Sequence, residues 1–503
     1  MASFRYQWSC SEVLDKCFML LFVLALFSLA LWLLLSWVKM KPKNFPPGPP
    51  CLPVLGSVLS LAGAKPHLRL EAWREQYGPV VGLVLPGSVP AVAVCGADAV
   101  FETLRRDEFQ GRPDDPDLRE RTLNQRLGML FNDGPAWVQQ RRFTLRHLRD
   151  FGFGKLSMEG RILEEVEDLL SSIRNNTVEV TELFPVHMVN ILWAITAGAR
   201  YERHDARLRQ LIDGVQRTFR SGNPTGATLG RIFPVLRTLA PRLVGYEQEV
   251  QSRRELYGFI REAIHEHMKT LDEDNPRDFI DVYLREMKNS GDPTFTEDGL
   301  AAIIFDLFAA GSDTVSNTLA FAIMYMILYP EVQEKVQKEL DTVVGHSRRI
   351  SLEDRPRLPY FEAVIAEISR INTTAPMCPP HVALKDTTLH GYNIPKGTWF
   401  FISLWCAMHD KGHWGDPHVF RPERFLDRET AAFTRDPYVI NFGTGARSCL
   451  GMPLAKNNLF LFLGAILQDL AVSLPAGEPR LSTDPLPGLT AAPRPFRAHF
   501  ATR

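Results

Sequence analysis

One segment of this chain, residues 442–451 (FGTGARSCLG), combines residue types suited to binding a metal. Its single cysteine, Cys449, follows a glycine-rich turn, has an arginine two residues before it, and begins an apolar stretch predicted to be a helix. A helix N-terminus favours the thiolate, the form of cysteine that binds metal, and glycines let backbone amides approach the sulfur. Since thiolate is one of the few axial ligands of haem iron, the segment predicts a haem-thiolate site.

A lone cysteine near a helix start is more often a small buried hydrophobic residue. The spacing Phe-x-x-Gly-x-Arg-x-Cys-x-Gly favours the ligand interpretation, because so many fixed positions in a short window rarely coincide. This spacing matches the haem-ligand loop of the cytochrome P450 family, and the chain resembles that family. The resemblance implies the cytochrome P450 fold, mainly α with small β-sheets, with haem b as cofactor and Cys449 as the axial ligand of its iron.

A second candidate motif is the segment 309–314 (AAGSDT), inside a long apolar helix predicted from Glu297 to Tyr329 and ended by Pro330. Glycine, serine, an acid and a β-branched residue are unfavourable in mid-helix, which predicts a local opening of the helix beside a ligand. The motif resembles the oxygen-activation motif of the family. The resemblance implies that Thr314 relays a proton to the activated oxygen and that Asp313 connects this relay to water. The alternative is a kink in which the threonine hydroxyl bonds to its own helix.

Glu367 and Arg370 lie three residues apart on one predicted helical face, a spacing usually found in solvated ion pairs. The downstream segment 420–425 (FRPERF) contains Arg424, and the family joins such an arginine to the Glu/Arg pair. The resemblance implies a buried network of these three residues that fixes the cysteine loop and so retains the haem.

The two haem propionates need cationic or donor partners. Trp137 and Arg141 place an indole N–H and a guanidinium one turn apart, as in the Trp-x-x-x-Arg propionate site of the family. His381 and Arg447 fall where the family has further propionate contacts. The alternative for Arg141 is a surface charge, since Arg142 adjoins it.

Location is indicated by residues 17–38, an uncharged run of 22 residues that is long enough to span a bilayer. Lysines follow it at 39, 41 and 43, which predicts a lumenal N-terminus and a cytosolic body. We therefore expect residues 1–16 in the lumen, a transmembrane helix at 17–38, a proline-rich hinge at 39–53 and a catalytic domain at 54–503. The expected location is the endoplasmic reticulum membrane, crossed once.

Composition excludes several other classes of protein. The net charge of −1 gives no reason to expect nucleic-acid binding. The seven cysteines form no C-x-x-C pair, which argues against a structural zinc site and a disulfide framework. Two β-branched runs at 77–95 predict a hairpin, and apolar spacing predicts helices at 163–173, 253–271 and 330–344.

The resemblance implies a monooxygenase that hydroxylates or epoxidises an apolar small molecule with O2 and electrons from NADPH-cytochrome P450 reductase, with cytochrome b5 as a further candidate donor. The segments 142–154 and 377–380 look most like arthropod members of the clan that contains family 2, so candidate substrates are terpenoid juvenile-hormone precursors, steroid hormones and xenobiotics. The alternative is a haem-thiolate isomerase or dehydratase that needs neither O2 nor reductase. The expected pocket residues are Phe305, Ala309, Ala310 and Met377.

Overall fold

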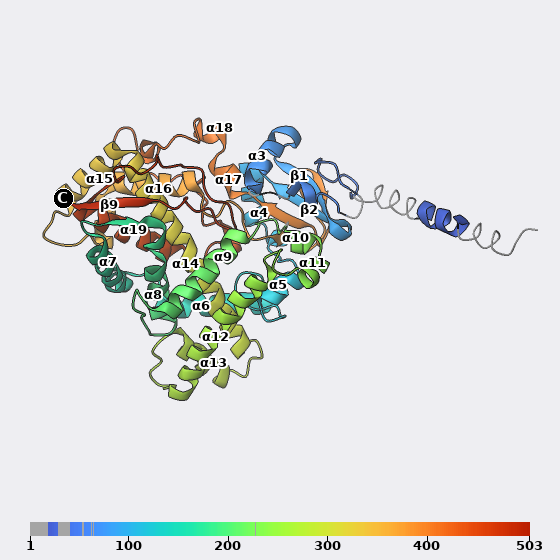
Figure 1. The fold of residues 1–503 in the computed structure, drawn as a ribbon, viewed down its shortest axis with the longest axis horizontal. Coiled ribbons are helices and arrows are strands. Elements are labelled where there is room, and N and C mark those ends of the chain that lie inside the picture. The colour runs from blue at the N-terminus through green and yellow to red at the C-terminus, as the bar shows by residue number, and fades with distance from the viewer. Residues whose placement is uncertain (1–18, 29–40, 53–54, 62, 64, 227) are drawn as a thin grey trace, which may run out of the picture.

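The computed structural model describes residues 19–28, 41–52, 55–61, 63, 65–226 and 228–503. Figure 1 shows helices gathered around a long central helix, with small sheets at the periphery. The predicted fold class, mainly α with small β-sheets, is confirmed.

The helices are numbered along the chain. Those before the central helix are α2 (Val58–Leu61), α3 (Pro66–Tyr77), α4 (Ala97–Arg105), α5 (Pro116–Arg121), α6 (Gly134–Asp150), α7 (Glu159–Ile173), α8 (Pro185–Thr196), α9 (Ala206–Ser221), α10 (Leu229–Ile232), α11 (Val235–Leu239), α12 (Tyr246–Thr270) and α13 (Phe279–Asn289). The remainder are α14 (Glu297–Leu328), α15 (Pro330–Val343), α16 (Pro359–Asn372), α17 (Leu404–Met408), α18 (Lys411–Trp414) and α19 (Met452–Asp469).

The central helix α14 begins with a capping interaction, because the Thr296 side chain accepts a hydrogen bond from the Gly299 amide. It ends at Leu328, one residue before the predicted end, and Pro330 starts α15. Among the described residues it is the one helix long and apolar enough to cross a membrane, yet most of it is buried inside the protein. It packs against α8, α12, α16 and α19, so its apolar character serves the core.

The predicted local opening of this helix is not present, because α14 is continuous through residues 309–314. Gly311 has a packing role instead: a Cβ there would lie 2.0 Å from Cδ1 of Leu192 on α8. The small residue in mid-helix therefore permits two helices to approach closely.

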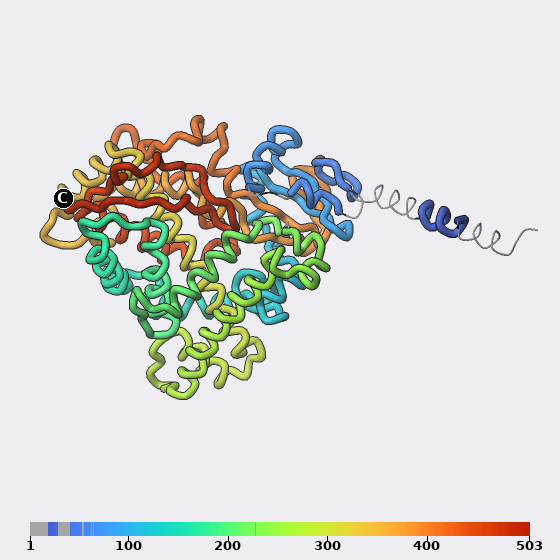
Figure 2. The backbone as a smooth tube through the Cα atoms, in the orientation of Figure 1, coloured from blue at the N-terminus to red at the C-terminus, as the bar shows by residue number. Residues whose placement is uncertain are grey.

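The predicted hairpin is observed as β1 (Val80–Leu85) and β2 (Val89–Val94), which pair antiparallel. They belong to a four-stranded sheet of order β1-β2-β7-β4, with β7 at Trp399–Ile402 and β4 at His381–Val382. A second sheet has the order β3-β9-β8 and a third pairs β5 with β6; their bounds are β3 (Thr177–Glu179), β5 (Thr387–Leu389), β6 (Tyr392–Ile394), β8 (Leu470–Ser473) and β9 (Arg497–Thr502). Figure 2 shows the C-terminal strand on the side of the molecule opposite the β1–β2 hairpin.

Near the N-terminus the structure describes a short apolar helix, Met19–Ser28, whose large side chains are half or more exposed. It lies inside the predicted span 17–38, the rest of which is outside the described residues. The predicted hinge is described at residues 41–52, where the Pro47 carbonyl accepts a hydrogen bond from Gly82 of β1 at 2.7 Å. This part of the hinge is therefore held against the first sheet.

Candidate functional site

The cysteine loop folds between a short 3-10 turn at Gly445–Arg447 and the start of α19 at Met452. The Cys449 amide donates a hydrogen bond to the Phe442 carbonyl at 2.8 Å, which closes the loop on itself. The Ser448 carbonyl accepts a hydrogen bond from Nη2 of Arg141 at 2.6 Å, so the loop is tied to α6.

The Cys449 side chain is exposed, although protein surrounds it closely enough for burial to raise the pKa of the thiol. The amides of Gly451 and Met452 and the charge of Arg141 lower the pKa, but by less. The amides at the start of α19 therefore act in the direction expected for a helix N-terminus, and desolvation outweighs them. Helix α19 begins three residues after the cysteine, and its N-terminus acts on the sulfur mainly through two amides.

Four arginines, Arg112, Arg126, Arg141 and Arg447, come together beside the loop, and their charges act on one another. One carboxylate, that of Asp133, faces this group among the described residues. It pairs with Arg126 at 2.7 Å and accepts the Arg112 amide at 2.7 Å. The other guanidinium groups donate to backbone carbonyls: Arg112 to Pro379 and Pro380, and Arg447 to Gln110 and Asn132.

This arginine cluster carries more positive charge than the protein compensates. Burial and the neighbouring cations lower the pKa of Arg112 to about 10 and that of Arg447 to about 9. Buried charge of one sign is costly unless an anion pairs with it. The cluster is therefore suited to a bound dianion, which fits the two propionates of haem.

Trp137 and His381, which were predicted to contact the propionates, lie at this cluster. In this structure both donate hydrogen bonds to backbone carbonyls. The Trp137 indole N–H donates to the Met129 carbonyl at 3.0 Å, and its ring lies 3.5 Å from the guanidinium carbon of Arg447. The His381 ring donates through Nδ1 to the Phe109 carbonyl at 2.8 Å, and burial, with Arg112 next, lowers its pKa well below the usual value. Trp137 therefore contributes a cation–π contact in this structure, and His381 directs its Nδ1 to the backbone.

Arg112 and Arg126 were not among the residues predicted from the sequence. They lie in a stretch without clear periodicity, and the tertiary fold brings them to Arg447. The Gly-Arg-Pro run at 111–113 is a weak local signal, because it resembles an ordinary turn.

Helix α14 presents an accessible side chain at the second motif. Of its 32 residues, all of which the structure describes, Ala310 alone is exposed. The Thr314 hydroxyl donates to the Ala310 carbonyl at 2.8 Å, which is the self-bonded arrangement of the alternative interpretation.

Asp313 is buried in a polar cluster, and the Thr314 hydroxyl is not among its hydrogen-bond partners. Its Oδ2 accepts hydrogen bonds from Arg220 of α9 at 2.9 Å, from Asn317 at 2.8 Å and from the Thr490 hydroxyl. Burial raises the pKa of Asp313, and the Arg220 charge opposes that rise. In this state Asp313 is tied to α9 and to the C-terminal segment, and its role in proton delivery stays a prediction.

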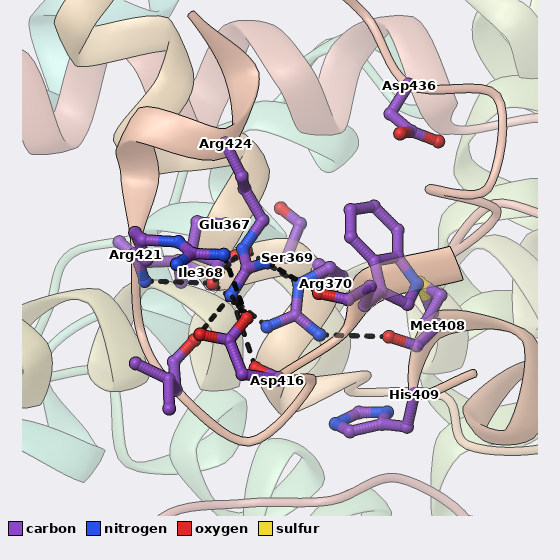
Figure 3. A network of polar contacts seen from close by, with 12 residues as sticks. Glu367, Ile368, Ser369, Arg370, Met408, His409, Asp416, Arg421, Arg424 and Asp436 are labelled. Carbon is purple, nitrogen blue, oxygen red and sulfur yellow. Dashed lines mark hydrogen bonds and ion pairs between the residues drawn. The ribbon is translucent and has the colours of Figure 1, made fainter. Parts of the chain in front are cut away.

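Glu367, Arg370 and Arg424 form a buried network (Figure 3). The Glu367 carboxylate accepts from Arg370 Nε at 2.6 Å and from Arg424 Nε at 3.1 Å. Arg370 also donates to the Met408 carbonyl at 2.9 Å. The adjacent Trp414 packs in a cluster that includes residues 438–439, just before the cysteine loop. The network thus supports the segment leading into that loop, and its effect on haem retention stays a prediction.

The predicted pocket residues are only partly brought together. Phe305 and Ala309 line a pocket with residues of α9 and α12 and with Arg121 of α5. Met377 is buried in a different cluster, beside β1 and β2, and neither it nor Ala310 lines this pocket.

The site as a whole consists of an accessible thiol on a closed loop, an undercompensated arginine cluster and a central helix with an accessible alanine. A dianionic group that carries a metal suits the thiol and the neighbouring arginine cluster. These residues fit a haem-thiolate site, in which Cys449 would ligate the iron and the arginine cluster would bind the propionates.

Comparison with known proteins agrees with this assignment. Residues 46–500 match the family model described as Cytochrome P450. The chain is 39% identical to "Farnesoate epoxidase" of Bombyx mori over 91% of this chain and 94% of that protein. It is 38% identical to "Probable cytochrome P450 305a1" of Drosophila melanogaster, over 92% of this chain and 95% of that protein. It is 37% identical to "Cytochrome P450 2J3" of Rattus norvegicus, over 87% of this chain and 88% of that protein.

The chain therefore belongs to the cytochrome P450 family, and it is a P450 monooxygenase with a haem cofactor. The predicted resemblance to arthropod members and to microsomal family 2 is confirmed.

Proposed function

We propose that this protein hydroxylates or epoxidises an apolar small molecule with O2 and electrons from NADPH-cytochrome P450 reductase. One oxygen atom enters the substrate and the other leaves as water, with two electrons from NADPH and two protons. Candidate substrates are terpenoids such as a juvenile-hormone precursor, steroid hormones and xenobiotics; the name of the Bombyx mori relative favours the terpenoids. The observation that carries the proposal is the exposed Cys449 thiol beside the arginine cluster.

Each part of the site has a role in this proposal. When bound, haem supplies the chemistry that cleaves O2. The arginine cluster neutralises its propionates and orients it, with Arg141 also holding the cysteine loop through Ser448. Thr314 offers a hydroxyl that can exchange its bond to the Ala310 carbonyl for one to a reacting group. Asp313 can join a proton path after the contact with Arg220 is released.

We propose that the electron donor is a protein that docks through an acidic surface. Arg142 and Arg146 are exposed on α6, the helix that holds the cysteine loop, and neither has an ion-pair partner among the described residues. Exposed cations of this kind steer an acidic partner and orient it on contact. Reductase is the proposed donor, and cytochrome b5 is a further candidate for the same surface.

We place the protein on the endoplasmic reticulum membrane, held by the predicted span at 17–38. A second apolar surface supports this. Leu229, Val235, Leu239 and Leu243 are each more than half exposed on α10, α11 and the residues that follow. Figure 1 places α10 and α11 beside the β1–β2 hairpin, next to the N-terminal part of the body. Exposed apolar residues grouped in this way are typical of a membrane contact.

Reconstitution tests the proposal. The purified protein is incubated with reductase, NADPH and a panel of terpenoids, steroids and fatty acids, and products are identified by mass spectrometry with ¹⁸O2. Incorporation of one labelled oxygen that depends on NADPH is expected. Turnover without NADPH would instead indicate the isomerase or dehydratase, and acceptance of purely polar substrates alone would contradict the apolar pocket.

A further inference from the structure

One carboxylate, that of Asp133, lies within the arginine cluster beside the cysteine loop. Its Oδ1 lies 2.7 Å from Nη2 of Arg126, and its Oδ2 accepts the Arg112 amide at 2.7 Å. The Asp133 side chain is 16% exposed. Both carboxylate oxygens are therefore directed at the cluster, where charge-assisted hydrogen bonds hold one anion among four cations.

Asp133 does not serve the helix that follows it. It directly precedes α6, and aspartate at such a position usually accepts hydrogen bonds from the first amides of the helix. Here the side chain makes no capping hydrogen bond. The carboxylate is thus committed to the arginines, and capping of α6 does not account for its presence.

The contact with Asp133 also fixes Arg126. The Arg126 side chain is 32% exposed, and its Nε is buried without a hydrogen-bond partner. A further carboxylate, Asp114, lies close enough for Arg126 to act on it, but Asp114 pairs with Arg119 at 2.5 Å. Among the described residues, Asp133 is therefore the carboxylate that forms an ion pair with Arg126.

The charge of Asp133 reaches the rest of the cluster. Burial lowers the pKa of Arg112 and of Arg447, and the Asp133 carboxylate opposes this fall in both. Four guanidinium groups face two propionates in the haem site assigned above. Because Asp133 cancels one of the cations, it halves the positive charge that remains after the propionates are bound.

We infer that Asp133 sets the reduction potential of the bound haem, holding it lower than the arginine cluster alone would hold it. Reduction adds one electron to the haem, and a nearby carboxylate disfavours the added negative charge, whereas a nearby cation favours it. Hydrogen bonds and charges around a haem are among the means by which a protein sets its potential. The inference rests on the proposed function and deepens it, since this potential governs how readily the haem accepts electrons from the donor protein.

The ion pair between Asp133 and Arg126 separates an effect of charge from an effect of structure. If Asp133 acts by its charge, removal of the carboxylate and removal of its partner change the potential in opposite directions. If the pair only holds the loop in place, breaking it from either side disturbs the haem site in the same way. Removal of both side-chain charges leaves the net charge of wild type.

Spectroelectrochemical titration of the purified haem protein measures the midpoint potential without substrate or reductase. Asp133→Asn keeps the size of the side chain and an oxygen acceptor for the Arg112 amide, and Arg126→Gln removes the cation. Asp150→Asn is the matched control, because it removes the same charge from the exposed far end of α6, about 25 Å along the helix axis and beyond the range of screened charges. The rate of haem transfer to apomyoglobin is measured in parallel.

D133N should raise the midpoint potential, so that the ratio of reduced to oxidised protein at a fixed potential rises about threefold to tenfold, a moderate effect because Arg126 is partly exposed. It should also slow haem loss. R126Q should lower the potential and speed haem loss, the double variant should return close to the wild-type potential, and D150N should match wild type.

An unchanged or lower potential in D133N, or shifts of the same sign in D133N and R126Q, would overturn the inference even if the enzyme oxidises its substrate. The expected shifts of opposite sign without any NADPH-dependent oxidation would leave the inference standing and refute the proposed function.

Discussion

Replacement of Glu367 by glutamine should destabilise the protein strongly. The Glu367 side chain is fully buried and accepts hydrogen bonds from Arg370, from Arg424 and from the Arg421 amide. Arg424 retains a second carboxylate, Asp416, at 3.2 Å, whereas Arg370 retains only the Met408 carbonyl among the described residues. Removing one partner of a buried pair costs about 3–5 kcal/mol. Since one of the two arginines keeps a counter-charge, we expect the lower end, about 3 kcal/mol.

Urea unfolding of the haem-bound protein measures this loss, followed by tryptophan fluorescence. Trp414 is a suitable reporter, because the Arg370 guanidinium lies 5.0 Å from its ring. Glu334→Gln is the control, since it removes an exposed i,i+4 pair with Lys338 at 2.8 Å and should leave the unfolding midpoint unchanged.

A loss below about 1 kcal/mol for E367Q would refute the reasoning, because it would mean that the buried cations find other partners or solvent. A double variant, Glu367→Gln with Arg370→Met, should be more stable than the sum of the single changes, since the unpaired charge is then absent. Additive effects would show that the two side chains do not act as a pair.

Gly311→Ala should destabilise by about 1–3 kcal/mol because its Cβ would overlap Leu192, and Leu192→Ala should restore part of the loss; an unchanged urea midpoint would contradict the close helix contact. Arg220→Met should raise the pKa of Asp313 further above the ordinary 3.8. A carboxyl whose pKa is raised by folding takes up protons on folding, so the free energy of unfolding falls as the pH rises from 3.8 to the pKa of the folded state. In the variant this fall should extend over a wider pH range than in wild type. Urea midpoints measured across pH test this, and identical pH profiles for the two proteins would refute it. Deletion of residues 1–40 should move part of the protein from the membrane to the soluble fraction in centrifugation, with its haem spectrum retained, because the exposed apolar surface on α10 and α11 is then the remaining membrane contact. Unchanged partitioning would contradict the predicted anchor.

The sequence predicts the fold class and several element boundaries because the relevant signals are local. The helix 297–329 is recognised by its apolar run and by Pro330, and the hairpin by its two β-branched runs. Gly311 within this helix led to the wrong prediction of a local opening, and the reason is physical. A small residue in mid-helix fits an opened turn and a close helix contact equally well, and only the position of Leu192 decides between them.

The site is predictable where its residues share a short motif and not where the fold assembles it. Cys449 is recognised from the spacing of its loop, and the pair Glu367 and Arg370 from the family resemblance that joins it to Arg424. Arg112 reaches the arginine cluster from a loop more than 300 residues before Cys449, so no local pattern predicts it. The thiol pKa is also beyond sequence reasoning, because desolvation by the whole fold outweighs the nearby amides and Arg141.

The central claim is that Cys449 is the thiolate ligand of a haem. The most direct measurement is the absorption spectrum of the dithionite-reduced protein with carbon monoxide, for wild type and Cys449→Ser. The account predicts the red-shifted Soret band of thiolate-ligated haem in wild type and its loss in C449S, while the variant remains in the membrane fraction. A wild-type spectrum without that band, or a C449S spectrum that retains it, would contradict the assignment.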